Sequence, residues 1–89
     1  MRENVLVVMV EWRNESGFGG EPLRVTATYD EAKKHLDNFI RDYAINNREE
    51  TNVEEFIENH WLNEEKDYWE YESPVSNSIE RYYICETEF

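Results

Sequence analysis

The chain has 89 residues, 21 of them acidic and 9 basic, so its formal net charge is −12. This length is enough for one domain over residues 1–89 and too short for a large enclosed substrate cavity. The acidity argues against direct binding to nucleic acid or to an anionic membrane, and a basic protein is its natural partner. No apolar run reaches the roughly 20 residues that span a bilayer, and signal-peptide features are lacking, so we expect a cytoplasmic protein.

The first part of the chain predicts a β-hairpin. Residues 5–12 are β-branched and apolar on both alternating faces, which is typical of a central strand. The stretch 14–22 contains glycines at 17, 19 and 20 and indicates a flexible hairpin loop. Residues 23–27 alternate apolar and polar side chains and should pair antiparallel with the first strand.

Two helices are predicted next, each opened by a capping box. Thr28 and Glu31 match the first box, in which both side chains satisfy free backbone donors at a helix start. The apolar residues that follow occupy one helical face: Tyr29, Ala32, Leu36, Phe39, Ile40, Tyr43 and Ala44. Thr51 and Glu54 match a second box, before a shorter helix that should end near Asn63 and turn Val53, Phe56, Ile57 and His60 inward.

The second half ends in two further strands. Residues 68–72 alternate aromatic and acidic side chains, 73–78 have the proline, serine and asparagine of a turn, and 79–89 favour a closing strand. Its odd positions lean apolar: Ile79, Tyr83, Cys85 and Phe89. The predicted fold is therefore a single α+β domain in ββααββ order, with an antiparallel sheet of about four strands and helices mainly on one face.

The histidines and the cysteine do not form a catalytic motif. His35 lies outside the apolar face of the first helix, and His60 is expected as a hydrogen-bonded histidine at the edge of the core. Cys85, on a strand and without a histidine nearby in sequence, favours a small buried apolar residue. We expect no catalytic residue, no cofactor and no resident metal, while adventitious binding of a divalent cation by the carboxylates stays open.

Most of the charge lies in one segment. Residues 49–72 hold ten acidic side chains against Lys66 alone, and on the second helix Glu54, Glu55 and Glu58 should project together into solvent. We predict a partner-binding surface formed by Glu50, Glu54, Glu55, Glu58, Glu65, Asp67 and Glu70. A charged face can also serve solubility alone, although closely spaced like charges destabilise a helix. The neighbouring aromatic residues Trp61, Tyr68, Trp69 and Tyr71 suit either a core or interface anchors.

The size, the charge and the acidic segment 49–72 resemble small, acidic, cysteine-poor proteins of phages and mobile elements that block host defence, including anti-CRISPR proteins and DNA mimics. The resemblance includes no specific motif, so no functional residue is carried over from it. It implies an acidic face that occupies a site meant for DNA, on a partner such as a nuclease or a CRISPR effector in a bacterial cytoplasm.

Two non-enzymatic hypotheses follow. In the first, the chain is an inhibitor whose acidic surface docks on the basic nucleic-acid-binding surface of an effector and excludes its substrate. In the second, it is a structural or regulatory protein-interaction module, a monomer or a homodimer, which binds through the apolar first strand because one helical layer covers only one face of the sheet. An enzyme or small-ligand module is the least favoured class, because catalytic motifs are lacking.

Overall fold

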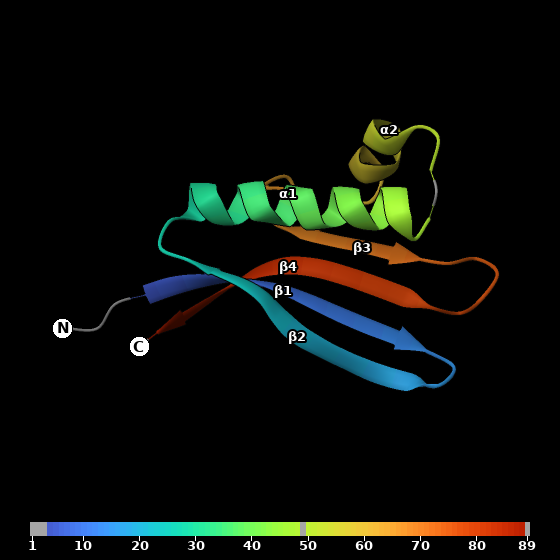
Figure 1. Ribbon diagram of the computed structural model, residues 1–89, viewed down its shortest axis with the longest axis horizontal. Helices are drawn as coiled ribbons and strands as arrows, with labels where there is room; N and C mark the ends of the chain where they lie inside the picture. The colour runs from blue at the N-terminus through green and yellow to red at the C-terminus, as the bar shows by residue number, and fades with distance from the viewer. Residues whose placement is uncertain (1–3, 49, 89) are drawn as a thin grey trace.

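The computed structural model describes residues 4–48 and 50–88. Its elements, in chain order, are β1 (Asn4–Asn14), β2 (Gly17–Thr26), α1 (Tyr29–Asn46), α2 (Val53–Glu58), β3 (Tyr68–Glu72) and β4 (Ile79–Glu88). The strands form one antiparallel sheet in the order β2-β1-β4-β3, and both helices lie over the same face of it (Figure 1). The α+β class and the ββααββ order predicted from the sequence are confirmed. None of the helices among the described residues is long and apolar enough to cross a membrane.

The sheet has one helix-covered face and one open face, and the strand registers assign each residue to one of them. On β1, Val8 and Val10 face the helices and are buried, whereas Val7 and Met9 point to the open face. Val10 pairs with Tyr82, which in turn pairs with Trp69, so one row of large apolar side chains crosses three strands. The central position predicted for the first strand is confirmed.

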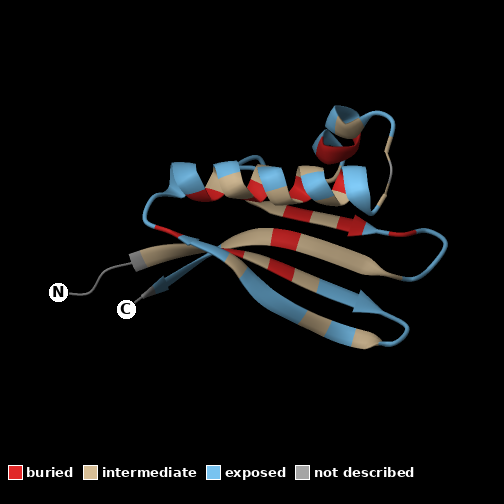
Figure 2. Ribbon diagram, viewed as in Figure 1, coloured by how far each residue is buried: buried red, intermediate tan, exposed pale blue. Residues whose placement is uncertain are grey.

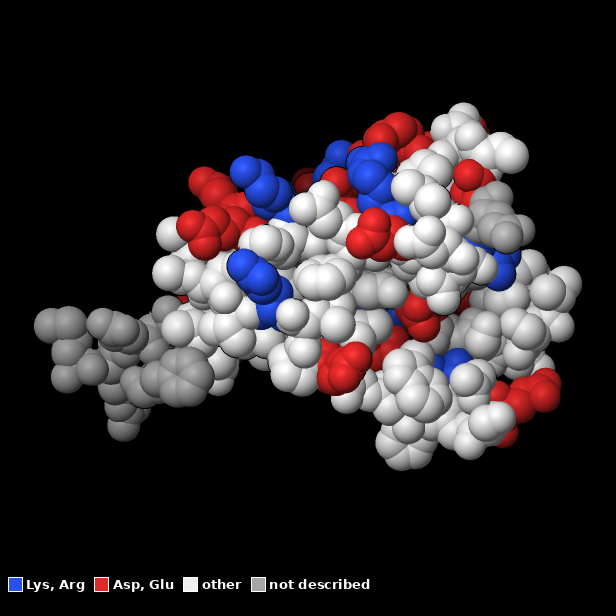
Figure 3. Space-filling view, viewed as in Figure 1, with Lys and Arg blue, Asp and Glu red and all other residues white. Residues whose placement is uncertain are grey.

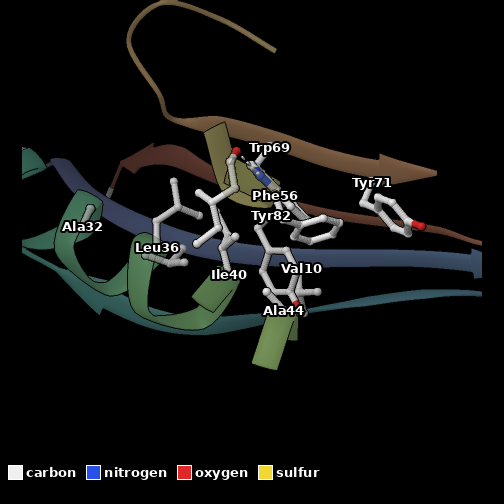
Figure 4. Close-up of a cluster of buried hydrophobic side chains, with 11 residues drawn as sticks. Val10, Ala32, Leu36, Ile40, Ala44, Phe56, Trp69, Tyr71 and Tyr82 are labelled. Carbon is white, nitrogen blue, oxygen red and sulfur yellow. Dashed lines mark hydrogen bonds between the residues drawn. The ribbon is translucent and has the colours of Figure 1, made fainter. Parts of the chain in front are cut away.

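The core lies between this row and the inner side of α1 (Figures 2 and 4). One buried cluster takes side chains from every element except β2: Val8, Val10, Ala32, Leu36, Ile40, Ala44, Phe56, Ile57, Trp69, Tyr71 and Tyr82. Trp69 is fully buried, and its indole Nε1 donates to the carbonyl of Ile57 at 3.0 Å. Aromatic rings thus join α2 and β3 to the main core, as expected for a short chain without disulfides.

The hairpin is longer than the sequence pattern predicts. The glycine-rich stretch belongs to β2 and not to a loop, and the chain reverses at residues 15–16, where the amide of Ser16 donates to Oδ1 of Asn14. Gly17 has a φ of 142°, which L residues rarely adopt. Gly19 lies opposite Trp12, and a Cβ there would come within 2.6 Å of the indole. The glycines therefore make room for the turn and for the Trp12 ring.

The first helix matches its prediction except at Tyr29, which was predicted on the apolar face and is 38% exposed. The hydroxyl of Thr28 accepts a hydrogen bond from the amide of Glu31 at 3.2 Å, as a helix N-cap does. Ala32, Leu36, Ile40 and Ala44 are buried. Phe39 and Tyr43 pack against the same cluster.

The second helix begins one residue later than predicted and ends earlier, at Glu58 instead of near Asn63. Its N-cap is Asn52, whose side chain accepts from the amide of Glu55 and donates to its carboxylate. After a turn at Asn59 and His60, the chain pairs with β3. The amide of Glu70 donates to the carbonyl of His60, and Trp61 forms an isolated antiparallel β-bridge with Trp69. Pairing with the edge of the sheet thus replaces further helical turns.

The sequence pattern places the apolar side chains of the closing strand, β4, on the wrong face of the sheet. The even residues Tyr82 and Ile84 pack on the core, while Ile79, Tyr83 and Cys85 lie on the open face. Cys85 is exposed and not buried as expected. Phe89 lies outside the described residues.

Candidate protein-binding surface

The acidic side of α2 is fixed by the two residues that the helix buries. Phe56 and Ile57 point into the core, so Glu54, Glu55 and Glu58 project into solvent, as the sequence predicts. A six-residue helix is not stable alone, and its orientation depends on these buried contacts and on the Asn52 cap. The buried contacts of Phe56 and Ile57 therefore determine which side of α2 carries the carboxylates.

Two of these carboxylates form ion pairs. Glu54 accepts a hydrogen bond from Arg41 of α1, which also contacts Asp37, and Glu58 pairs with Lys66 at 3.1 Å. The side chains of Glu54 and Glu58 keep 73% and 56% of their surface exposed, so both pairs lie in solvent and hold little energy. A basic partner can replace Arg41 or Lys66 at small cost. The hydrogen bond from Arg41 lowers the pKa of Glu54, which keeps this carboxylate charged.

The turn that follows α2 brings Glu65 and Asp67 to the same side of the molecule. Glu65 is exposed, as is its neighbour Glu64, and Lys66 adopts a left-handed φ of 57° between the two predicted residues. Asp67 is less available, because it accepts hydrogen bonds from Tyr29 at 2.5 Å and from Asn63.

The pKa values at this turn follow from those contacts. Burial opposes ionisation of Asp67, but the hydrogen bonds from Tyr29 and Asn63 outweigh it, so the pKa of Asp67 is lowered. Burial and the adjoining Asp67 raise the pKa of Tyr29 to about 12. Asp67 is therefore a charged acceptor that ties the turn to the start of α1.

The remaining two predicted residues lie apart from this group. Glu50 is partly exposed and precedes α2, with its amide bonded to the carbonyl of Ala44 at the end of α1. Glu70 lies on the open face of the sheet, where Arg81 donates to it at 2.6 Å and 2.9 Å. The structure thus places Glu54, Glu55, Glu58, Glu65 and Asp67 on the helix side and Glu70 on the opposite face of the sheet. Glu50 lies at the end of α1, whereas Asp67 is bonded to the start of that helix.

The histidines lie as the sequence predicts. His60 is partly buried, its Nδ1 is 2.7 Å from the carbonyl of Phe56, and its ring packs on Phe56, Trp69 and Tyr71. His35 is partly exposed on α1. Over residues 4–48 and 50–88, no group of three or more His, Cys, Asp or Glu side chains is arranged to hold a metal ion.

Sequence reasoning missed a groove between α1 and the sheet. It has a volume of about 330 Å³, and its lining includes carboxylates from three elements: Glu21 of β2, Asp42 of α1 and Glu80 of β4. Trp12 and Tyr43 line it as well. These residues are far apart in sequence and share no motif spacing, so only the fold reveals that they converge.

A second hollow of about 280 Å³ lies near the tip of the hairpin, between β1, β2 and the start of β4. It is lined by Glu11, Arg13 and Arg81 together with the exposed ring of Phe18. Arg81 is already engaged there with Glu70 and, at 3.9 Å, with Glu11. The charged lining of this hollow is one carboxylate and two guanidinium groups, whereas the charged lining of the groove is entirely acidic.

Comparisons with protein-family models, with curated proteins and with solved structures found no match.

Proposed function

We propose that this protein acts by binding a basic protein through the acidic face formed by Glu54, Glu55, Glu58, Glu64 and Glu65. The observation that carries the proposal is the exposure of these five carboxylates on α2 and on the turn that follows it. Only Glu54 and Glu58 have basic partners among the described side chains, and both pairs are exposed. Residues 28–67 as a whole carry 12 acidic and 5 basic side chains, so the helix layer is strongly negative.

The partner class that fits this face is a nucleic-acid-binding protein, and the expected outcome is inhibition. Surfaces that bind DNA or RNA are rich in Arg and Lys spaced to meet phosphates. An array of carboxylates competes for the same cations and accelerates association electrostatically. The effector, a nuclease or a CRISPR complex, would then lose access to its substrate. Figure 3 shows acidic side chains over α2 and at the start of α1, interrupted by a few basic ones.

A capture experiment tests this proposal. The chain is immobilised, exposed to a bacterial lysate at low salt and eluted with rising salt, and eluted proteins are identified by mass spectrometry. We expect a nucleic-acid-binding protein whose retention falls steeply between about 0.1 and 0.5 M salt. Purified, that protein should lose DNA or RNA binding when the chain is added. Retention that ignores salt, or nucleic-acid binding that is unaffected, would contradict the proposal.

A matched pair of variants separates the acidic face from net charge. In the first, Glu54, Glu55 and Glu58 are changed to Lys, and capture should be abolished. In the second, Glu15, Glu72 and Glu86 are changed to Lys, which shifts the net charge equally at exposed positions outside the face. Capture should survive in this control. Equal loss in both variants would mean that bulk charge, and not this face, recruits the partner.

The open face of the sheet favours a second candidate, self-association into a homodimer. Val7, Met9 and Val25 lie on it without any covering helix, and Val25 is 56% exposed. Its strand residues include three acidic and two basic side chains, Glu11, Glu70, Glu72, Arg13 and Arg81, so two copies could meet there with little repulsion. Sedimentation velocity across a wide concentration range tests it: a dimer lost in Val7→Glu supports this candidate, and a monomer at every concentration rejects it.

A further inference from the structure

The groove between the second half of α1 and the sheet has an apolar floor and an acidic rim. Val10, Leu23 and Phe39 contribute to its apolar lining, and its volume of about 330 Å³ is at the lower end of the range for ligand sites in proteins. It opens on the face seen in Figure 3, between the helix layer and the hairpin. A groove of this size accommodates one long side chain.

The charge of the groove is entirely negative. Glu21 lies beside Val10 in the sheet, Glu80 lies beside Trp12, and Asp42 enters from α1. No Lys or Arg is found among the described residues that line it. Three carboxylates around apolar side chains favour a ligand that is cationic and also has an apolar stem.

The aromatic lining favours the same kind of ligand. Trp12 is 40% exposed, Tyr43 is partly buried, and the rings of Tyr43 and Tyr82 are 5.8 Å apart. Cations bind over the faces of such rings, and Trp is the strongest of them. The protein already uses this contact nearby, since the guanidinium of Arg48 lies 4.6 Å over the ring of Tyr71 and donates to its hydroxyl at 2.8 Å.

Glu80 is the member of the acidic set that most needs a cation. Its carboxylate is half-buried, and burial raises its pKa even though it accepts a hydrogen bond from Tyr82 at 3.1 Å. Among the described side chains it forms no ion pair. A guanidinium between Glu80 and Trp12 would compensate for this desolvation and would stack on the indole at the same time.

We propose that this groove is the binding pocket for one arginine side chain of the basic partner, with Glu80 as the half-buried counter-ion and Trp12 and Tyr43 as the stacking surfaces. The inference rests on the proposed function and adds to it an anchor beside the acidic face. Asp42 and Arg41 are consecutive on α1, and Arg41 contacts Glu54 of α2, so the groove and the acidic face flank one helix. Arginine is preferred over lysine because its planar, weakly hydrated head group stacks on aromatic rings.

Nuclear magnetic resonance titration with a small probe tests the pocket. N-acetyl-arginine methyl ester is added to the ¹⁵N-labelled chain, and we expect saturable shifts at the Trp12 indole and at the amides around Glu80 and Tyr43. The citrulline analogue has nearly the same shape without the charge, so it should bind at least about tenfold more weakly. Equal binding of both probes, or shifts spread over the whole acidic surface, would overturn the inference.

Two variants assign the effect to Glu80. Glu80→Gln should weaken binding of the arginine probe about tenfold, because it removes the half-buried charge while keeping the shape. Glu86→Gln alters an exposed carboxylate outside both the groove and the acidic face and should leave the affinity unchanged. Equal losses in the two variants, or an unchanged affinity in Glu80→Gln, would reject the pocket. Amide spectra of the free variants verify that both are folded.

The outcomes for the pocket and for the proposed function can be distinguished. Binding of the probe in the groove, combined with partner capture that survives reversal of Glu54, Glu55 and Glu58, keeps the pocket and rejects the acidic-face proposal. Loss of capture on that reversal, combined with a probe that does not bind in the groove, keeps the proposed function and rejects the pocket.

Discussion

Both faces of the sheet carry aromatic side chains, but only those on the helix-covered face form the core. On β3, Trp69 and Tyr71 point to the helices and are buried, whereas Tyr68 and Glu70 point to the open face. Beneath the helices, rings from α1, α2 and two strands, β3 and β4, pack together. On the open face, Tyr68 stacks on Tyr83 at 5.3 Å, and no helix covers this pair. Aromatic residues thus form the core on one face and a flat, accessible layer on the other.

The two faces also differ in charge, because most of the acidic side chains belong to the helix layer. The helix layer, residues 28–67, carries 12 acidic and 5 basic side chains, whereas the charged strand residues on the open face are three acidic and two basic ones. Arg81 contacts Glu70 and Glu11 and lies 5.7 Å from the ring of Tyr68. The proposed basic partner would therefore bind on the helix side, and a neutral or self-complementary partner on the open face.

The largest effect should follow from removing the ring shared by both helices and the sheet. Trp69→Ala leaves a cavity at a fully buried position and breaks the hydrogen bond to Ile57, so we expect a loss of about 3 to 5 kcal/mol in the free energy of unfolding. Urea denaturation followed by circular dichroism measures it. For a domain of this size such a loss can unfold the chain, so Trp69→Phe, with an expected loss of about 1 to 3 kcal/mol, is measured in parallel.

The neighbouring position on the same strand is the control. Tyr68→Ala removes a partly exposed ring from the open face and should destabilise the chain by about 1 kcal/mol. If Tyr68→Ala proved as damaging as Trp69→Phe, the open face would be covered in solution and the contrast between the faces would be wrong.

A smaller effect is expected at the turn after α2. The lowered pKa of Asp67 means that its contacts stabilise the fold fully above the ordinary value of 3.8 and are lost as the pH falls through the lower, folded value. Asp67→Asn should therefore be about 1 kcal/mol less stable at pH 7, a figure reduced for solvent screening, and should lose less stability in acid than the parent. Urea denaturation from pH 2.5 to 7 gives both quantities.

Tyr29→Phe sharpens this test, because it removes one donor to Asp67 and leaves the carboxyl in place. The pKa of Asp67, followed by carbonyl carbon chemical shifts, should rise in this variant. An unchanged pKa would mean that the Tyr29 contact does not hold the turn on α1.

A substitution in the groove should stabilise the chain, whereas the preceding ones destabilise it. Burial raises the pKa of Glu80 above its ordinary value of 4.5, so ionisation of Glu80 destabilises the fold above that value. Glu80→Gln should thus stabilise the chain at pH 7 by less than about 1 kcal/mol, with the gain disappearing below about pH 4.5. Thermal unfolding at pH 4 and pH 7 measures the difference. A variant less stable than the parent at pH 7 would show that Glu80 is already compensated.

Local signals in the sequence predict α1 well, because its N-cap and its apolar face can both be recognised from the spacing of nearby residues. The end of α2 could not be found in this way: His60 continues the apolar spacing, yet its carbonyl accepts from Glu70 in the sheet. β4 was ambiguous because Tyr83 and Cys85 are as apolar as Tyr82 and Ile84, and only the packing of α1 decides which pair is buried. Tertiary contacts overrode local patterns in both cases.

The residues of the candidate surface also divide into those that local sequence patterns place correctly and those that depend on tertiary contacts. Glu54, Glu55 and Glu58 were found because a helix places near neighbours on one side, and the buried Phe56 and Ile57 fix that side. Glu70 could not be placed, since its face depends on the register of β3 with β4. The groove was invisible for the same reason, because Glu21, Asp42 and Glu80 meet only after the hairpin, α1 and β4 have packed together.

The smallest effect on stability is expected at Cys85, which also reports on whether the open face is free. Cys85 is exposed and lies beside Val7 in the sheet, so Cys85→Ser should change the free energy of unfolding by less than about 0.5 kcal/mol. A thiol reagent should modify the native parent chain almost as fast as the urea-unfolded chain at low protein concentration. If two copies join through the open face, the native rate should fall as the concentration rises, and Val7→Glu should restore it. A rate that is slow at every concentration would instead place Cys85 inside the folded monomer and contradict the exposed position.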